Sequence, residues 1–220
     1  MTGSPGMTAR FESRWPAALA VIFVLVLLAL LPARLAVMPR WMPYALGAVM
    51  LVPLAGVEFS GHASRWLRIE RIALLAAALF GIVTNVITVT RLVYTMLFEP
   101  NAIAPITLLT SSVAAWVANV VLFALVYWLT DRGGPDAREH GQGGESDYLF
   151  TQVANPRSAT PDWSPTFVDY FSLAFNTSTA FSPTDTLPLT PRGKILMMLQ
   201  SSISLVTIVV VAARAINILK

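Results

Sequence analysis

Long apolar segments separated by short polar stretches recur along this chain of 220 residues. Each approaches the roughly 20 apolar residues that a helix needs to cross the hydrocarbon core of a bilayer. The expected spans are residues 17–33, 41–59, 72–97, 106–129 and 194–218. Hydrophobic residues make up 55% of the sequence and charged residues 12%, about half the charged share of a soluble domain. The sequence therefore predicts an all-α membrane protein with about five transmembrane helices.

Composition also argues against several classes of function. The net charge is +3, but the basic residues are scattered through the loops and form no stripe for a nucleic acid. The chain has no cysteine, and His62 and His140 are far apart, so we expect no metal site. No Ser–His–Asp grouping, H-E-x-x-H helix or glycine-rich phosphate loop is present. We therefore expect no enzyme, no cofactor and no nucleic-acid partner; the expected environment is the lipid bilayer of a cell membrane.

The first apolar run follows a positively charged lead that contains Arg10 and Arg14. That arrangement is also typical of a signal peptide. However, Arg34 and Met38 interrupt the region after the run, and no clear small-x-small cleavage site is present. A transmembrane helix is the preferred interpretation.

The next two spans are separated by a basic stretch, residues 61–71, in which Trp66 lies among arginines. Tryptophan beside arginine is typical of the headgroup layer. This predicts an interfacial segment before the third span. Pro43 and Pro53 are expected to break the second span, because proline removes a helical hydrogen bond.

Two stretches between the last two spans are too polar or too short to cross the bilayer. Residues 131–164 are rich in Gly, Pro, Asp, Glu and Ser, which predicts a flexible loop outside the membrane. Residues 166–189 are semi-polar and too short to cross twice. Non-helical backbone at membrane depth is tolerated where it is buried in protein or lines water. We therefore expect a re-entrant helix at about 165–180.

The segment of residues 167–194, which includes most of that second stretch, reads F-V-D-Y-F-S-L-A-F-N-T-S-T-A-F-S-P-T-D-T-L-P-L-T-P-R-G-K. It resembles the pore helix, filter and outer mouth of potassium channels, whose filter motif is T-V-G-Y-G. In an ungapped match Thr179 and Ala180 fall on the two threonines at the base of the filter. Phe181, Ser182, Pro183 and Thr184 fall on V-G-Y-G, Asp185 on the following aspartate, and Pro188 and Thr190 on the mouth. Similar filterless versions occur in bacterial membrane proteins of unknown function.

The match departs from the family at the two filter glycines, which are Ser182 and Thr184 here, with Pro183 between them. Glycine allows the left-handed dihedrals that point successive carbonyls at an ion. The resemblance therefore implies a weakly selective pore for monovalent cations, formed by a homotetramer because one pore loop cannot enclose an axis. Alternatively, Pro, Thr and Asp are ordinary turn formers that match by chance.

Polar residues also recur inside two spans. Gln200, Ser204 and Thr207 lie on one face of the last span, which predicts either the lining of a pore or hydrogen bonds between helices. The third span contains Arg91 on a threonine stripe. Arg91 is expected to extend to the headgroups, with voltage sensing or pairing with Glu99 as alternatives.

These features divide the chain into residues 1–100, with three helices, and a pore-like region, residues 101–220. Within the second region lie the outer helix 106–129, the polar loop 131–164, the pore helix and filter 165–189, and the inner helix 194–218. The leading hypothesis is a cation pore. The alternatives are a non-conducting membrane protein built on the same scaffold and a small transporter, which the lack of a repeated half disfavours. The resemblance places Asp185 outside, whereas Arg65, Arg68 and Arg71 weakly favour the opposite orientation.

Overall fold

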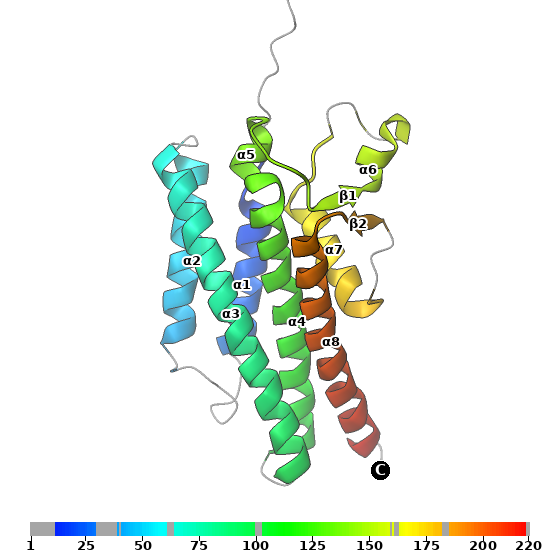
Figure 1. The fold of residues 1–220 in the computed structure, drawn as a ribbon. Coiled ribbons are helices and arrows are strands. Elements are labelled where there is room, and N and C mark those ends of the chain that lie inside the picture. The colour runs from blue at the N-terminus through cyan, green and yellow to red at the C-terminus, as the bar shows by residue number, and fades with distance from the viewer. Residues whose placement is uncertain are drawn as a thin grey trace, which may run out of the picture.

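The computed structural model describes residues 12–29, 39, 41–60, 64–99, 103–158, 160, 163–181 and 185–218. Its long helices are α1 (Trp15–Ala29), α2 (Met42–Phe59), α3 (Ser64–Phe98), α4 (Pro105–Thr130) and α8 (Pro191–Ile218) (Figure 1). Among the described residues, 4 helices are long and apolar enough to cross a membrane: α2, α3, α4 and α8. Helix α1 is apolar but has 15 residues, and the rest of the predicted first span lies outside the described residues. The prediction of an all-α membrane protein is confirmed.

Two details of the predicted spans are wrong. Helix α3 begins at Ser64 rather than at residue 72, so the basic stretch with Trp66 forms its first turns. Helix α2 continues through Pro53 instead of breaking there. Transmembrane helices tolerate an internal proline when neighbouring groups bond to the backbone carbonyl that the proline leaves free. Pro53 is buried, so neighbouring groups surround it. Pro43 lies in the first turn of α2, where an N–H has no helical partner to lose.

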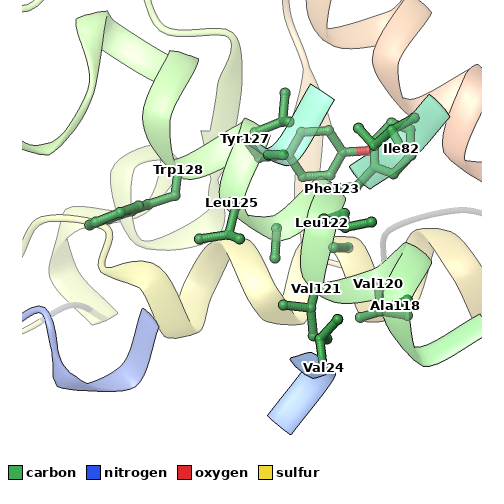
Figure 2. Packing of buried hydrophobic residues seen from close by; sticks show 14 of the residues in the cluster. Val24, Ile82, Ala118, Val120, Val121, Leu122, Phe123, Leu125, Tyr127 and Trp128 are labelled. Atoms are coloured by element: carbon green, nitrogen blue, oxygen red, sulfur yellow. The ribbon is translucent and has the colours of Figure 1, made fainter. Parts of the chain in front are cut away.

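Helix α4 is the centre of the bundle, and it packs against α1, α3, α7 and α8. Every residue from Ala118 to Leu129 is buried, so this part of α4 has no free face. Figure 2 shows this packing, with Val24 of α1 and Ile82 of α3 joining the side chains of α4. Met197 of α8 belongs to the same hydrophobic cluster. The two predicted regions of the chain therefore share one continuous core.

Short elements gather at one end of the bundle (Figure 1). They are η1 (Asp131–Gly133), α5 (Pro135–Glu139), β1 (Tyr148–Phe150), α6 (Thr151–Ala154), η2 (Pro156–Ser158), α7 (Phe167–Thr179) and β2 (Thr186–Pro188). Strands β1 and β2 pair antiparallel, with Tyr148 opposite Pro188 and Phe150 opposite Thr186. The chain before α7 and the chain after it are therefore joined beside that helix.

The prediction that residues 131–164 form a flexible loop is wrong for the part that the structure describes. Aromatic residues anchor this segment: Tyr148 and Phe150 are buried and pack edge-on against Tyr170 of α7. Asp131 is also buried, and its carboxylate accepts hydrogen bonds from Tyr170 Oη at 2.6 Å and from the Asp147 N–H at 2.6 Å. The prediction was based on the average composition of the segment, which does not reveal the few residues that anchor it.

Candidate functional site

The candidate site is the contact between α7, α4 and α8, where the sequence predicts a pore helix. Helix α7 begins with a capping box, in which Thr166 and Asp169 each accept a backbone hydrogen bond from the other. It has 13 residues, which corresponds to about 20 Å at 1.5 Å per residue. A helix of that length cannot cross a hydrocarbon core of about 30 Å. A short helix is therefore present where the sequence predicts a re-entrant one, and it is too short to be a span; its re-entry into a membrane stays a prediction.

One face of α7 is covered by the bundle. Tyr170, Leu173, Ala174, Thr177 and Ser178 are buried, and their spacing of three and four residues defines one side of a helix. This side packs on α4 and α8. Phe175 flanks it and meets Trp116 of α4 edge-on, with ring centroids 5.8 Å apart. Helix α7 is therefore a packed element of the bundle, not a surface appendage.

The side chain of Gln200 connects all three helices. Its Nε2 donates to the Ala174 carbonyl of α7 at 2.8 Å and to Ser178 Oγ at 2.8 Å. Its Oε1 accepts from Tyr127 Oη of α4 at 2.5 Å. Both amide hydrogens and the amide oxygen therefore have partners.

A second contact lies one turn further along α8. Asn119 Nδ2 of α4 donates to Ser204 Oγ at 2.9 Å and to the backbone carbonyl of Gln200 at 3.2 Å. We call Asn119, Tyr127, Ser178, Gln200 and Ser204 the amide network. Neutral hydrogen bonds of this kind hold helices together inside a membrane, where water is absent.

These positions correct the predicted pore lining. Gln200, Ser204 and Thr207 have exposed fractions of 0%, 0% and 1%, because the rest of their own chain covers them. Gln200 and Ser204 make the interhelical hydrogen bonds of the alternative prediction, whereas Thr207 Oγ1 donates to the Ile203 carbonyl of its own helix. The predicted polar stripe is present, but it is buried inside the subunit and lines no open surface.

The described filter-like residues, Thr179, Phe181 and Asp185, lie at or after the C-terminal end of α7. Thr179 is exposed, and its hydroxyl donates to the Phe175 carbonyl at 3.0 Å. Phe181 is exposed and has a left-handed φ of 55°, an uncommon conformation for a bulky residue. Ser182, Pro183 and Thr184 lie outside the described residues. Asp185 follows, half-buried, and its carbonyl accepts the Thr151 N–H at 3.1 Å.

A buried tyrosine and an ion pair hold β1 in place beside the filter-like segment. Tyr148 packs on Tyr127 with ring centroids 5.1 Å apart. Burial, with Asp147 nearby, raises the pKa of the Tyr148 hydroxyl well above its ordinary value, so this group stays neutral. The carboxylate of Asp147 pairs with Arg192 and accepts from Thr190 Oγ1 at 2.5 Å. These contacts connect β1 to the start of α8.

The free face of α8 is apolar. Its exposed large hydrophobic side chains are Ile195, Met198, Leu199, Leu205, Val206 and Val209. Ser202 lies among them, and its hydroxyl donates to the Met198 carbonyl of the same helix at 2.8 Å. This face is the opposite of the one that the sequence predicts for a pore lining.

Sequence reasoning missed a charged cluster at the other end of α7. The N–H of Phe167, the first residue of α7, donates to Glu12 Oε1 at 2.6 Å. Glu12 belongs to a group of buried glutamates and arginines that comes from several helices. No local spacing brings residues so distant in sequence together, and Glu70 was assigned to an interfacial stretch. Arg91 is exposed, and its predicted role stays a prediction.

Comparisons with protein-family models, with curated proteins and with solved structures find no match for this chain. The fold and its apolar helices define the class, a multi-pass, all-α membrane protein.

Proposed function

We propose that this protein is a channel-like membrane protein whose α4, α7 and α8 form one subunit of a weakly selective cation pore. The observation that carries the proposal is the position of α7. This helix is too short to span, yet it is fixed between two long apolar helices by Gln200. The order of long helix, polar loop, short helix, filter-like segment and long helix matches the order implied by the resemblance to potassium channels.

The depth of α7 along α8 agrees with a pore helix. Gln200 lies nine residues after Pro191, the first residue of α8, or about 14 Å along the helix at 1.5 Å per residue. Because Gln200 contacts Ala174 and Ser178, the last turns of α7 lie about a third of the way along α8. The C-terminal carbonyls of α7 carry the negative end of the helix dipole, which favours cations at this end of the helix, where Thr179 and Phe181 are exposed.

The groups available to an ion at this end are oxygen atoms. Thr179 supplies a hydroxyl at the exposed end of α7, and Asp185 supplies a half-buried carboxylate after the filter-like segment. A carboxylate attracts cations over anions without ranking sodium against potassium. We therefore expect a permeability ratio of potassium to sodium below about tenfold, which corresponds to less than about 1.4 kcal/mol of discrimination.

A pore requires further copies of the chain, and the free face of α8 is the surface available to enclose it. In a homotetramer Ser202 and its apolar neighbours Leu199 and Val206 would face the axis, because the polar stripe is occupied within the subunit. The lining would then be mostly apolar. Apolar constrictions gate channels by excluding water, so this lining suggests low conductance at rest.

The second candidate is a non-conducting protein that uses the same scaffold for sensing or partner interaction. One observation favours it: the buried polar groups of α8 are hydrogen-bonded within a single chain, so its apolar face fits lipid as well as it fits a pore axis. In that case Asp185 and Thr179 would contact no permeating ion.

Ion flux from proteoliposomes, together with the oligomer mass in detergent, separates the two candidates. A pore gives rapid cation flux down a gradient and a mass of several subunits, and Asp185→Asn weakens its preference for cations over anions. A monomer without flux would contradict the pore.

Cysteine accessibility tests the assigned lining. In a pore Ser202→Cys reacts with charged, membrane-impermeant thiol reagents and the reaction reduces flux, whereas Ser204→Cys stays unreactive because it is buried. The chain contains no other cysteine, so the background is clean. Reaction at Ser204→Cys without reaction at Ser202→Cys would show that α8 is turned the other way.

A further inference from the structure

Five charged side chains from different elements meet at the end of the bundle where α7 begins. Glu12 and Arg14 precede α1, Glu70 lies on α3, and Arg138 and Glu139 lie on α5. We call these five residues the glutamate–arginine cluster. Their side chains have exposed fractions between 1% and 11%, so water has little access to the charges.

Arg14 is at the centre of the cluster. Its Nε lies 3.0 Å from Glu70 Oε1 and its Nη1 lies 3.1 Å from Glu139 Oε1. Glu12 lies between the two cations, 3.9 Å from Arg14 Nη1 and 3.7 Å from Arg138 Nη2. Each arginine therefore contacts at least one carboxylate, and Arg14 contacts three.

The charges of the cluster do not balance. Three carboxylates face two guanidinium groups, so full ionisation would leave one uncompensated negative charge in a buried site. An unpaired buried charge destabilises a protein by several kcal/mol. Protonation of one carboxyl group removes this excess.

Unpaired polar atoms in the cluster are a second, independent observation. Glu139 Oε2 is buried and has no hydrogen-bond partner in the described part of the chain, although Oε1 of the same group accepts two hydrogen bonds. A proton can therefore bind to Glu139 Oε2 without breaking an existing hydrogen bond. Arg14 Nη2 is likewise buried without a partner, which leaves donors free for a shared water.

Among the described residues, no further cation pairs with the three carboxylates. Glu58 of α2 accepts the Arg14 N–H at 3.1 Å and adds a partly exposed carboxylate. Asp131 is buried, and its carboxylate bonds to Tyr170, Ser146 and the Asp147 N–H, with no arginine. Arg71 of α3 is exposed, and His140, at the end of α5, is exposed and pairs with Asp136. The described surroundings therefore add negative charge to the cluster.

We propose that the glutamate–arginine cluster is a binding site for one proton, which Glu12, Glu70 and Glu139 share at neutral pH. The three carboxyl groups form one coupled site, since each of them contacts Arg14. A metal cation is a poor alternative occupant, because two arginines occupy the cluster and no described group of His, Asp or Glu side chains has the arrangement of a metal site. Burial raises the pKa of the Glu12 carboxyl, against the opposing effect of Arg138.

The bound proton matters for α7. Glu12 accepts hydrogen bonds from the Phe167 N–H of α7 and from Trp128 Nε1 of α4, at 2.6 Å and 2.9 Å. Loss of the proton would place excess negative charge beside this contact and weaken the packing of residues 12–14 against α5 and α7. This inference is independent of ion conduction, since it requires only the cluster.

Infrared spectroscopy of the full chain in detergent tests the site, because a protonated carboxyl group has a carbonyl band that a carboxylate lacks. The intact protein should show one such band at neutral pH that disappears at alkaline pH. Glu70→Gln and Glu139→Gln should each lack that band at neutral pH, since two carboxylates then face two arginines. Glu145→Gln, at an exposed glutamate, is the matched control and should keep the band.

A variant of Arg138 changes the charge balance of the cluster in the opposite direction. Arg138→Gln leaves three carboxylates with one arginine, so the band at neutral pH should become about twice as intense, in line with one extra proton. Unchanged bands in all three cluster variants, or no band in the intact protein, would overturn the proposal. If a variant does not fold, the remaining variants and the titration of the intact chain still decide.

Discussion

Helix α7 is held at its two ends by contacts of opposite character. At its N-terminus the contact is ionic: Glu12 accepts the first N–H of the helix and belongs to a cluster with more carboxylates than arginines. Near its C-terminus the contact is neutral: Gln200 bonds to Ala174, Ser178 and Tyr127 with every amide group used. The neutral contact should be insensitive to pH, whereas the ionic contact should respond to it. The same helix thus has one fixed end and one adjustable end.

The largest expected effect comes from Arg14→Met. This change leaves Glu70 and Glu139 buried without the cation that joins them. Removing one partner of a buried ion pair costs about 3–5 kcal/mol of the free energy of unfolding. Thermal unfolding in detergent measures the loss, and it should be partly recovered at acidic pH, where the carboxyl groups are neutral.

Arg68→Met is the matched control for that change, because Arg68 is exposed on α3. We expect it to alter the free energy of unfolding by no more than about 0.5 kcal/mol. If both variants lose the same stability, Arg14 does not carry the ionic contact.

The neutral contact should be weaker than the ionic one but still measurable. Gln200→Leu removes three hydrogen bonds and leaves Tyr127 Oη unpaired, which should cost about 1–3 kcal/mol. Adding Tyr127→Phe removes the unpaired hydroxyl, so the double variant should recover part of the loss. A double-mutant cycle measured at neutral and alkaline pH should give the same coupling energy at both.

The pH dependence should follow Glu12. Burial raises its pKa in the folded state. Between the ordinary glutamate pKa and the raised one, Glu12 therefore keeps its proton in the folded protein and has lost it in the unfolded chain. The free energy of unfolding should therefore fall as the pH rises from the ordinary glutamate pKa through the raised one. Glu12→Gln should flatten this slope in thermal unfolding measured across that range. An identical slope in the intact protein and in the variant would assign the titration elsewhere.

The smallest effect concerns the end of α7. Phe181 holds a left-handed φ of 55° just after the helix, where Gly or Asn is preferred. Phe181→Asn should therefore raise the free energy of unfolding by about 0.5 kcal/mol. The same change at Phe175, which is helical and packs on Trp116, should lower it instead. Such a pair would indicate that Phe181 is retained for a reason other than stability.

Hydropathy predicted the elements whose limits depend on local sequence. The fourth span was expected at 106–129 and α4 is Pro105–Thr130, since apolar length alone determines where such a helix can cross. The short helix was expected at 165–180 and is Phe167–Thr179, because Thr166 and Asp169 form a capping box. The local sequence was sufficient to predict the limits of both helices.

Periodicity located the polar face of α8 but could not identify what covers it. Gln200 and Ser204 share one side of a helix whether that side meets water or another helix, and only the packing of α4 and α7 decides. The glutamate–arginine cluster was beyond sequence reasoning for a similar reason. Arg14 and Glu139 are separated by 125 positions, and nothing local relates them.

The pairing of β1 with β2 has a consequence for biosynthesis. Strand β1 precedes α7 and β2 follows it, so their pairing closes a loop of the chain that contains this helix. A growing chain emerges from its N-terminus, so α7 leaves the ribosome before both β2 and Gln200 exist. Until then Ser178 and the Ala174 carbonyl lack the partner that α8 provides. Completion of the last helix is therefore the step that fixes the C-terminal half of α7, and a chain truncated before α8 would present that half to cellular quality control without its hydrogen-bond partner.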